Sequence, residues 1–170
     1  MPKLIKRGEN GAFGWAENPF VTVGDEDALP QADVIVPLKR FLAEGEGAQP
    51  SNHAVGVLVQ PGETIEDLAY DLPRVAVVAL AFPKFSDGRA LSAARLLRER
   101  YGFKGEIRAV GEVLREAALH MVRCGFDAFE ASDGSTPEEW EAAAIKRYRH
   151  VYQRAADERP PAFVERGTGS

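Results

Sequence analysis

The chain of 170 residues has little cysteine, no long apolar run and no excess of positive charge. Its single cysteine, Cys124, cannot form an internal disulfide and cannot supply the four thiolates that usually hold an iron–sulfur cluster. We therefore predict no cofactor, and a redox role would have to use a cofactor held by another protein. The short apolar stretches predict neither a membrane span nor a secretion signal, so the sequence indicates a soluble, cytoplasmic protein.

Acidic residues outnumber basic ones, with 26 Asp and Glu against 21 Lys and Arg, which gives a net charge of -5. This balance argues against nucleic acid or an anionic membrane as a partner, because both attract clustered positive charge. The 45% hydrophobic content is enough for one buried core. We expect a single α/β domain over residues 33–158, an extended N-terminal segment over 1–32 packed on it, and a mobile tail over 159–170.

Apolar segments of strand length alternate with segments of helical periodicity, most regularly from His53 onwards. The connections are too long for hairpins, so the strands should be parallel and joined by right-handed crossovers. We predict an α/β fold whose parallel sheet is built from four or five consecutive strand–helix units. It is either a half-barrel with sequential strand order, which we favour, or an open three-layer sheet. The predicted strands cover residues 33–36, 54–59, 75–81, 105–110 and 126–130.

Helix boundaries are marked by specific residues. Glycine after the helical pattern predicts a stop at Gly102 and again at Gly125, where the predicted helix 112–123 ends. The sequence Thr136-Pro137-Glu138-Glu139 predicts a capping box that begins the last helix. The aromatic residues of that helix, Trp140, Tyr148 and Tyr152, fit a buried stripe.

The loop 82–89, with the sequence FPKFSDGR, follows the most apolar predicted strand and precedes a helix. Open α/β sheets and barrels place ligands at the carboxyl ends of their strands, where the next helix directs unpaired N–H groups toward them. The loop combines cationic, acidic and hydroxyl groups at this position. It is therefore a candidate site for a small anion.

The candidate ligand-binding residues come from this loop, the following helix and two later strands: Lys84, Ser86, Asp87, Arg89, Ser92, Arg108 and Glu130. A second interpretation gives them structural roles. Asp87 or Ser86 would then cap the helix while Lys84 and Arg89 are solvated. Arg108 and Glu130 would each be one half of an ion pair.

His120 and Cys124 are four residues apart on a predicted helix and therefore share one face. That spacing suits a thiolate–imidazolium pair or two metal ligands. Two ligands do not make a metal site, and a cysteine just before a capping glycine more often packs in the core. We predict no metal at this pair, and the sequence does not identify catalytic residues.

Four motifs occur in order over residues 82–130: FPKFSDGR, SAARLLRER, RAVGEVLR and RCGFDAFE. In these motifs the chain resembles bacterial domain of unknown function family 934, which often carries an oxidoreductase label and is commonly encoded beside assimilatory sulfite reductase. The sequence departs from that family at 116–120, Glu-Ala-Ala-Leu-His, where relatives have an acid–amide pair followed by aromatic residues.

The resemblance implies a part in sulfate assimilation, at or near the reduction of sulfite to sulfide. It supplies no reaction, and the sequence contains no Gly-rich dinucleotide motif, no P-loop and no cysteine cluster. Two hypotheses follow. The first is an accessory protein that binds sulfite reductase or its electron donor. The second is a small α/β enzyme, or a binder of a phosphorylated or sulfated metabolite, that uses the loop 82–89.

Overall fold

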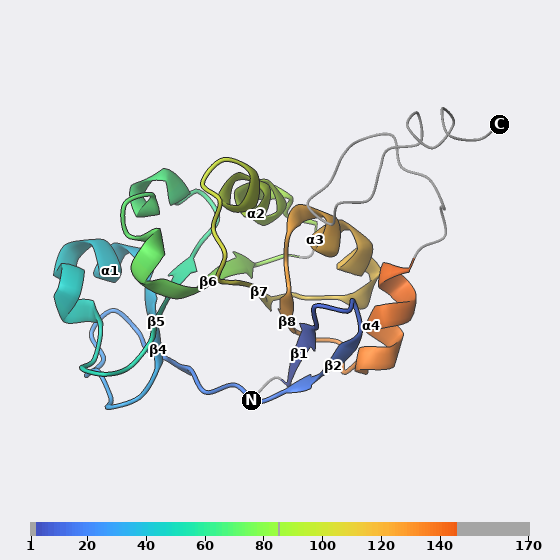
Figure 1. Ribbon diagram of the computed structural model, residues 1–170, viewed down its shortest axis with the longest axis horizontal. Helices are drawn as coiled ribbons and strands as arrows, with labels where there is room; N and C mark the ends of the chain where they lie inside the picture. Colours follow the sequence, from blue (N-terminus) through green and yellow to red (C-terminus); the bar gives the residue numbers. More distant parts are fainter. Residues whose placement is uncertain (1–2, 85, 146–170) are drawn as a thin grey trace.

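An eight-stranded sheet curls into a half-barrel in the computed structural model, which describes residues 3–84 and 86–145 (Figure 1). Its strand order is β2-β1-β8-β7-β6-β5-β4-β3. The strands are β1 (Leu4–Arg7), β2 (Phe13–Ala16), β3 (Val21–Thr22), β4 (Val34–Pro37), β5 (Val55–Val59), β6 (Val75–Phe82), β7 (Glu106–Gly111) and β8 (Ala128–Glu130).

The sheet is mostly parallel. Strands β3 to β8 pair in parallel, each with its neighbour in sequence. β1 then pairs antiparallel with β8, and β2 antiparallel with β1. The α/β class is confirmed, and the sheet is a half-barrel rather than a flat open sheet. The prediction of a purely parallel sheet was wrong, because residues 4–16 add two antiparallel strands at one edge.

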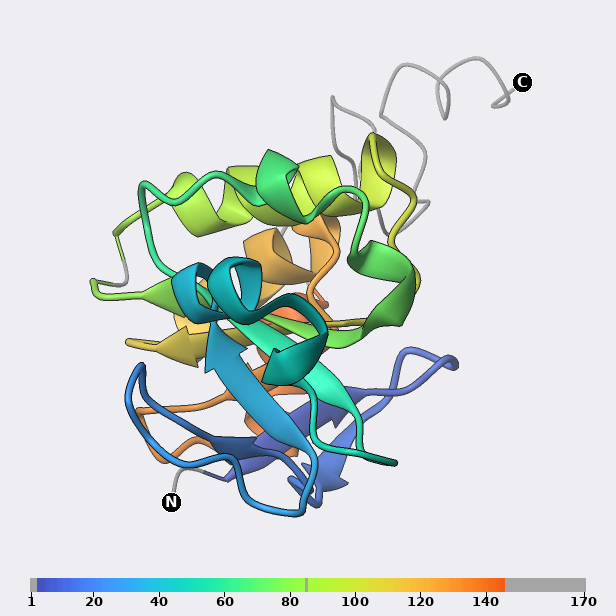
Figure 2. The same ribbon diagram turned by 90° about the vertical axis from the view of Figure 1, so that its left-hand side faces the viewer.

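The helices that cross between parallel strands cover the convex side of the sheet (Figures 1 and 2). α1 (Leu38–Glu44) joins β4 to β5, α2 (Arg89–Glu99) joins β6 to β7, and α3 (Ala118–Cys124) joins β7 to β8. Two short 3₁₀ helices, Ile65–Leu68 and Leu72–Arg74, fill the crossover from β5 to β6. α4 (Pro137–Ala144) follows β8 and packs beside β2.

Several local predictions can be compared with these elements. The capping box is confirmed: Thr136 accepts a hydrogen bond from the backbone of Glu139, whose side chain accepts one in return. Gly125 caps α3 in the left-handed conformation, as expected. The helix predicted from residue 112 begins later, with a 3₁₀ turn at Arg115–Ala117. Tyr148, Tyr152 and the tail 159–170 lie outside the described residues.

β6 is buried on both faces, as its continuous apolar sequence predicts. Val78, Leu80 and Phe82 point toward the helices and join the main core. Val77 and Ala79 point to the concave side, where they pack with Ile35. Trp140 of α4 closes the core at the other end of the sheet, with its ring 4.6 Å from that of Phe129.

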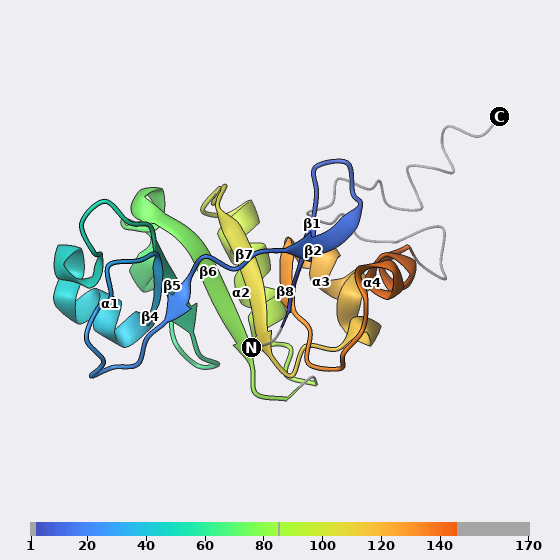
Figure 3. The same cartoon turned by 90° about the horizontal axis from the view of Figure 1, so that it is seen from below.

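The connection between β2 and β3, residues 17–20, crosses the concave side of the half-barrel, and we refer to it as the strap. It must span the sheet because β2 and β3 are the two opposite edge strands. Figure 3 shows the strap in blue, passing across β7 and β6. Phe20 of the strap packs against the small apolar cluster on this side. The concave face is therefore covered by the chain's own N-terminal segment.

The turn after β7 gives a test of the fold. Gly111 has a φ of +96°, and a Cβ there would press on the backbone carbonyl of Phe82. We expect Gly111→Ala to lower the free energy of unfolding by about 2 kcal/mol or more, measured by urea denaturation. Gly88→Ala is the control, because Gly88 has a φ of −79° and open space around it. Equal stability of the two variants would show that the turn tolerates a Cβ.

Candidate functional site

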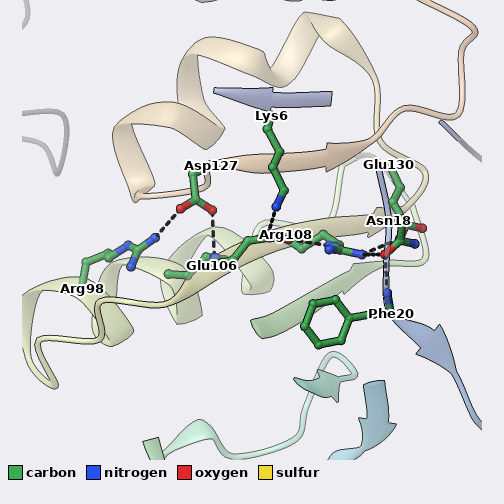
Figure 4. Close-up of polar contacts among 9 residues, drawn as sticks. Lys6, Asn18, Phe20, Arg98, Glu106, Arg108, Asp127 and Glu130 are labelled. Atoms are coloured by element: carbon green, nitrogen blue, oxygen red, sulfur yellow. Dashed lines mark hydrogen bonds and ion pairs between the residues drawn. The ribbon is translucent and has the colours of Figure 1, made fainter. Parts of the chain in front are cut away.

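Arg108 lies in the middle of β7 and points to the concave side (Figure 4). Its neighbours Ile107 and Ala109 belong to the core on the other face, so the alternation of the strand turns Arg108 away from the helices. The side chain is 0% exposed. A buried charge destabilises the folded protein unless polar or charged partners compensate it, so this guanidinium requires such partners around it.

Three oxygens and one ring surround the guanidinium. Nε donates to Glu106 Oε1 at 2.6 Å. Nη1 donates to Asn18 Oδ1 of the strap at 2.8 Å and lies 3.4 Å from Glu130 Oε1 at the end of β8. The Phe20 ring lies 5.7 Å from Cζ, close enough for a cation–π contact. Arg108 therefore fastens the strap to β7 and β8.

The second carboxylate oxygen of Glu106 contacts Lys6 of β1 instead of Arg108. Lys6 Nζ lies 2.6 Å from Glu106 Oε2. A carboxylate facing Arg108 alone could bind it through two parallel hydrogen bonds, but Glu106 is shared and uses only one oxygen on it. Nη2 of Arg108 is buried and has no hydrogen-bond partner within the described part of the chain.

Glu130 is the more weakly held of the two carboxylates. Its 3.4 Å distance to Nη1 exceeds the roughly 2.7–2.9 Å of a good charge-assisted hydrogen bond. Burial raises the pKa of Glu130, and the positive charge of Arg108 opposes this rise only in part. Glu130 therefore takes up a proton more readily than an exposed glutamate does.

A second charged pair lies at the amino ends of the same strands. Asp127 Oδ1 accepts from the backbone N–H of Ile107 at 2.9 Å, and Oδ2 lies 3.2 Å from Nη2 of Arg98 in α2. Arg98 also donates to three backbone carbonyls, those of Phe103, Gly105 and Gly125. Burial raises the pKa of Asp127 to about 6, with Arg98 acting against it. This pair joins α2 to β7 and β8.

The loop 82–89 lies beyond the carboxyl end of β6. Asp87 and Arg89 pair with each other, with Arg89 Nη2 2.7 Å from Asp87 Oδ2. Asp87 also accepts the backbone N–H of Arg89, the first residue of α2, and hydrogen bonding from Arg89 lowers the pKa of Asp87 to about 2. Lys84, Ser86 and Ser92 are exposed, and Phe85 lies outside the described residues.

The predicted site residues thus fall into two groups. The structure brings Asp87 to Arg89, and Arg108 to Glu130. It does not bring these pairs together. Arg108 is opposite Ala79, three residues before the end of β6, which puts it about 10 Å back along the strand and beneath the strap. The loop 82–89 instead borders a small cavity of about 50 Å³ beside the turn Gln60–Glu63.

A larger cavity lies between the loops that follow β7 and β8. It measures about 500 Å³ and adjoins another of about 680 Å³ between α3 and α4. Arg115 and Glu139, 2.5 Å apart, line both. The second cavity is lined by Glu116 and His120. Both belong to the segment 116–120, where the sequence differs from the family that the four motifs resemble.

Cys124 is half-buried, and burial raises the pKa of its thiol. A raised pKa disfavours the thiolate, which agrees with a packing role. Among the residues that the structure describes, no three His, Cys, Asp or Glu side chains are grouped so that they could hold a metal ion.

Sequence reasoning missed Lys6, Asn18, Glu106, Arg98 and Asp127. Glu106 could have been found, because Glu106, Arg108 and Val110 alternate with apolar residues and so share one face of a strand. Asn18 carries no such signal, since nothing local to residues 17–20 indicates that they cross the sheet. The contact of Lys6 with Glu106 depends on the pairing of β1 with β8, and this pairing is equally non-local.

The geometry defines the class: a mostly parallel α/β half-barrel with a buried arginine network on its concave face. The chain belongs to a family described as bacterial protein of unknown function (DUF934), whose model matches residues 56–163. The match includes Arg98, Arg108, Asp127 and Glu130, while Lys6 and the strap lie before it. A search of curated proteins found no match. No helix within the described residues is long and apolar enough to cross a membrane.

The raised pKa of Asp127 predicts a pH dependence of stability. Its folded-state pKa of about 6 lies above the ordinary value of 3.8, so the folded protein binds this proton more tightly. The contribution of Asp127 to stability is therefore full at low pH and is lost as the pH rises from about 4 to about 6. The Asp127→Asn variant keeps a side-chain oxygen that can accept the backbone N–H of Ile107, but its amide cannot ionise.

Urea unfolding of the wild type and of Asp127→Asn should be measured at several pH values across that window. We expect the wild type to lose stability relative to the variant as the pH rises. Glu66→Gln, at an exposed position, controls for the removal of one negative charge. Parallel curves for the wild type and Asp127→Asn would show that Asp127 is not the group that titrates.

Proposed function

We propose that the protein is a cytoplasmic accessory of assimilatory sulfite reduction that binds sulfite reductase or its electron donor and assists electron delivery or assembly. The observation that carries the proposal is the family match over residues 56–163. The four motifs within that span resemble sequences commonly encoded beside assimilatory sulfite reductase. An accessory role also suits a chain whose sequence offers no cofactor motif of its own.

The charged candidate residues are largely paired with one another. Asp87 is engaged with Arg89, and Arg108 with Glu106 and Glu130, so these side chains stabilise one another. The surface offers large aromatic side chains for contact with a protein. Tyr70, between the two 3₁₀ helices of the β5–β6 crossover, is 98% exposed, and Trp15 of β2 is 51% exposed. Tyrosine and tryptophan are enriched among residues that dominate binding energy at interfaces.

Tyr70 lies within the family match and is the better candidate for a shared contact. We expect the purified protein to associate with sulfite reductase or its electron donor at low micromolar concentration. Tyr70→Ala should weaken this association about tenfold or more, as truncation of an interface hot spot does. Leu42→Ala is the control, because Leu42 is an exposed apolar residue on α1. Isothermal titration calorimetry measures both. Failure to associate, with unchanged sulfite-reducing activity, would contradict the proposal.

A second candidate function is a small α/β enzyme, or a binder of a phosphorylated or sulfated anionic metabolite, at the loop 82–89. It is favoured by exposed Lys84 and Ser86 beside the start of α2 and by the adjoining cavity of about 50 Å³. The pairing of Asp87 with Arg89 acts against this function. The carboxylate of Asp87 already accepts hydrogen bonds from the guanidinium of Arg89 and from the first backbone N–H of α2. A bound anion would have to replace Asp87.

Thermal unfolding with sulfate, phosphate and adenylyl sulfate tests this second function. A ligand at a hundred times its dissociation constant should raise the free energy of unfolding by about 2.7 kcal/mol. We expect Arg89→Ala to abolish that gain and Asp87→Asn to enlarge it, since the neutral amide frees Arg89. Lys39→Ala, which removes an exposed positive charge on α1, is the control. Stabilisation that persists in Arg89→Ala would place the anion elsewhere.

A further inference from the structure

The unpartnered Nη2 of Arg108 marks a place where the protein can accept one more oxygen atom. Nε and Nη2 form one edge of the planar guanidinium, the edge that carboxylates and related oxyanions bind through two parallel hydrogen bonds. Glu106 occupies Nε only, because Lys6 holds its other oxygen. Nη2 is buried and is left without a partner among the described residues. Buried donors in native proteins are rarely left so.

We propose that Arg108 binds a small carboxylate or oxyanion beneath the strap, through Nη2, with Glu130 as the group that adjusts the charge. The site is separate from the loop 82–89 and goes beyond the proposed partner binding. Its ligand class follows from the donor: Nη2 is a positively charged N–H donor, and because Glu106 already engages Nε, the anion would bind with one oxygen on Nη2.

Charge balance determines how such an anion can be accommodated. The groups that face Arg108 are Glu106 of the same strand, Glu130 of β8, and Asn18 and Phe20 of the strap, with Lys6 of β1 behind Glu106. Two positive and two negative charges already cancel. A further negative charge is tolerated if one carboxylate takes up a proton. Glu130 is that carboxylate, because its contact with Arg108 is the longer one and burial raises its pKa.

A protonated Glu130 also gains a function. Its O–H can donate to the bound anion, while the ionised form can only accept. Anion binding and proton uptake are therefore linked. Above the pKa of Glu130, affinity for a monoanion should fall about tenfold for each unit of pH.

The strap covers the site. Arg108 is fully covered, whereas Asn18 and Pro19 of the strap are exposed. Asn18 Oδ1 already supplies one oxygen to Nη1, so the strap provides part of the oxygen shell that an anion would complete. Asn18→Asp would place a negative charge on Nη1 with almost no change of shape. The variant should therefore weaken the binding of an external anion at Nη2, because it already neutralises the guanidinium.

Calorimetric titration of the full chain with formate and with sulfate, at constant ionic strength maintained with chloride, tests the proposal. We expect affinity to fall as the pH rises above the pKa of Glu130, by about tenfold for each unit of pH. Proton uptake should appear as a dependence of the measured heat on buffer ionisation enthalpy. Binding of formate alone would assign a planar carboxylate, and binding of both would assign an oxyanion site of broader shape.

Substitutions test whether the bound anion lies at Arg108. Glu130→Gln should bind the anion with little dependence on pH, and both Arg108→Lys and Asn18→Asp should weaken binding at least tenfold. Lys39→Ala, which removes an exposed positive charge on α1 that neither candidate site includes, should leave binding unchanged. Circular dichroism checks that Arg108→Lys folds. If Arg108→Lys does not fold, Asn18→Asp still tests whether the anion lies at Arg108. The proposal is overturned if the wild type binds neither anion, or if Asn18→Asp binds as tightly as the wild type. Association with sulfite reductase is measured independently of these outcomes.

Discussion

The guanidinium of Arg108 stays inside the half-barrel because side chains from distant parts of the chain surround it. Glu106 and Glu130 come from two neighbouring strands, and Asn18 and Phe20 come from the strap. A buried charge without such partners would be strongly destabilising. The same contacts hold the N-terminal segment across the concave face. The arginine therefore links the matched family region, which begins at residue 56, to the strands and strap that precede it.

The two faces of the sheet are stabilised in different ways. Apolar side chains of α1, α2, α3 and α4 cover the convex face, where burial of apolar area is the main driving force. The concave face has a smaller apolar cluster and a charged network, and the strap crosses it in place of a helix. Charges can be retained there because oxygens of Glu106, Glu130 and Asn18 face the buried guanidinium. Nη2 of Arg108, which has no partner among the described residues, is the reason to consider this face as a binding surface.

Local patterns predicted much of the helix-covered half of the molecule. The apolar run of β6, the capping box at Thr136 and the glycine at the end of α3 each depend on neighbours within a few residues. The late start of the helix after β7 was not predictable in this way. Glu112 first donates to the carbonyl of Phe82 on the neighbouring strand, and that contact turns the chain before the helix can form. The pairing of Asp87 with Arg89 is local, but neither interpretation of that loop included it.

Composition and periodicity were enough to establish the α/β class, the buried strand and the acidic, cysteine-poor character of the chain, because they do not depend on which segments meet. Where the polar groups gather depends on the packing of the folded chain. Arg108 and Glu130 became partners because β7 and β8 are adjacent, and Asn18 joined them because β2 and β3 occupy opposite edges of one sheet. Asn18 and Arg108 are 90 positions apart in the sequence, and no local pattern encodes a contact over that separation.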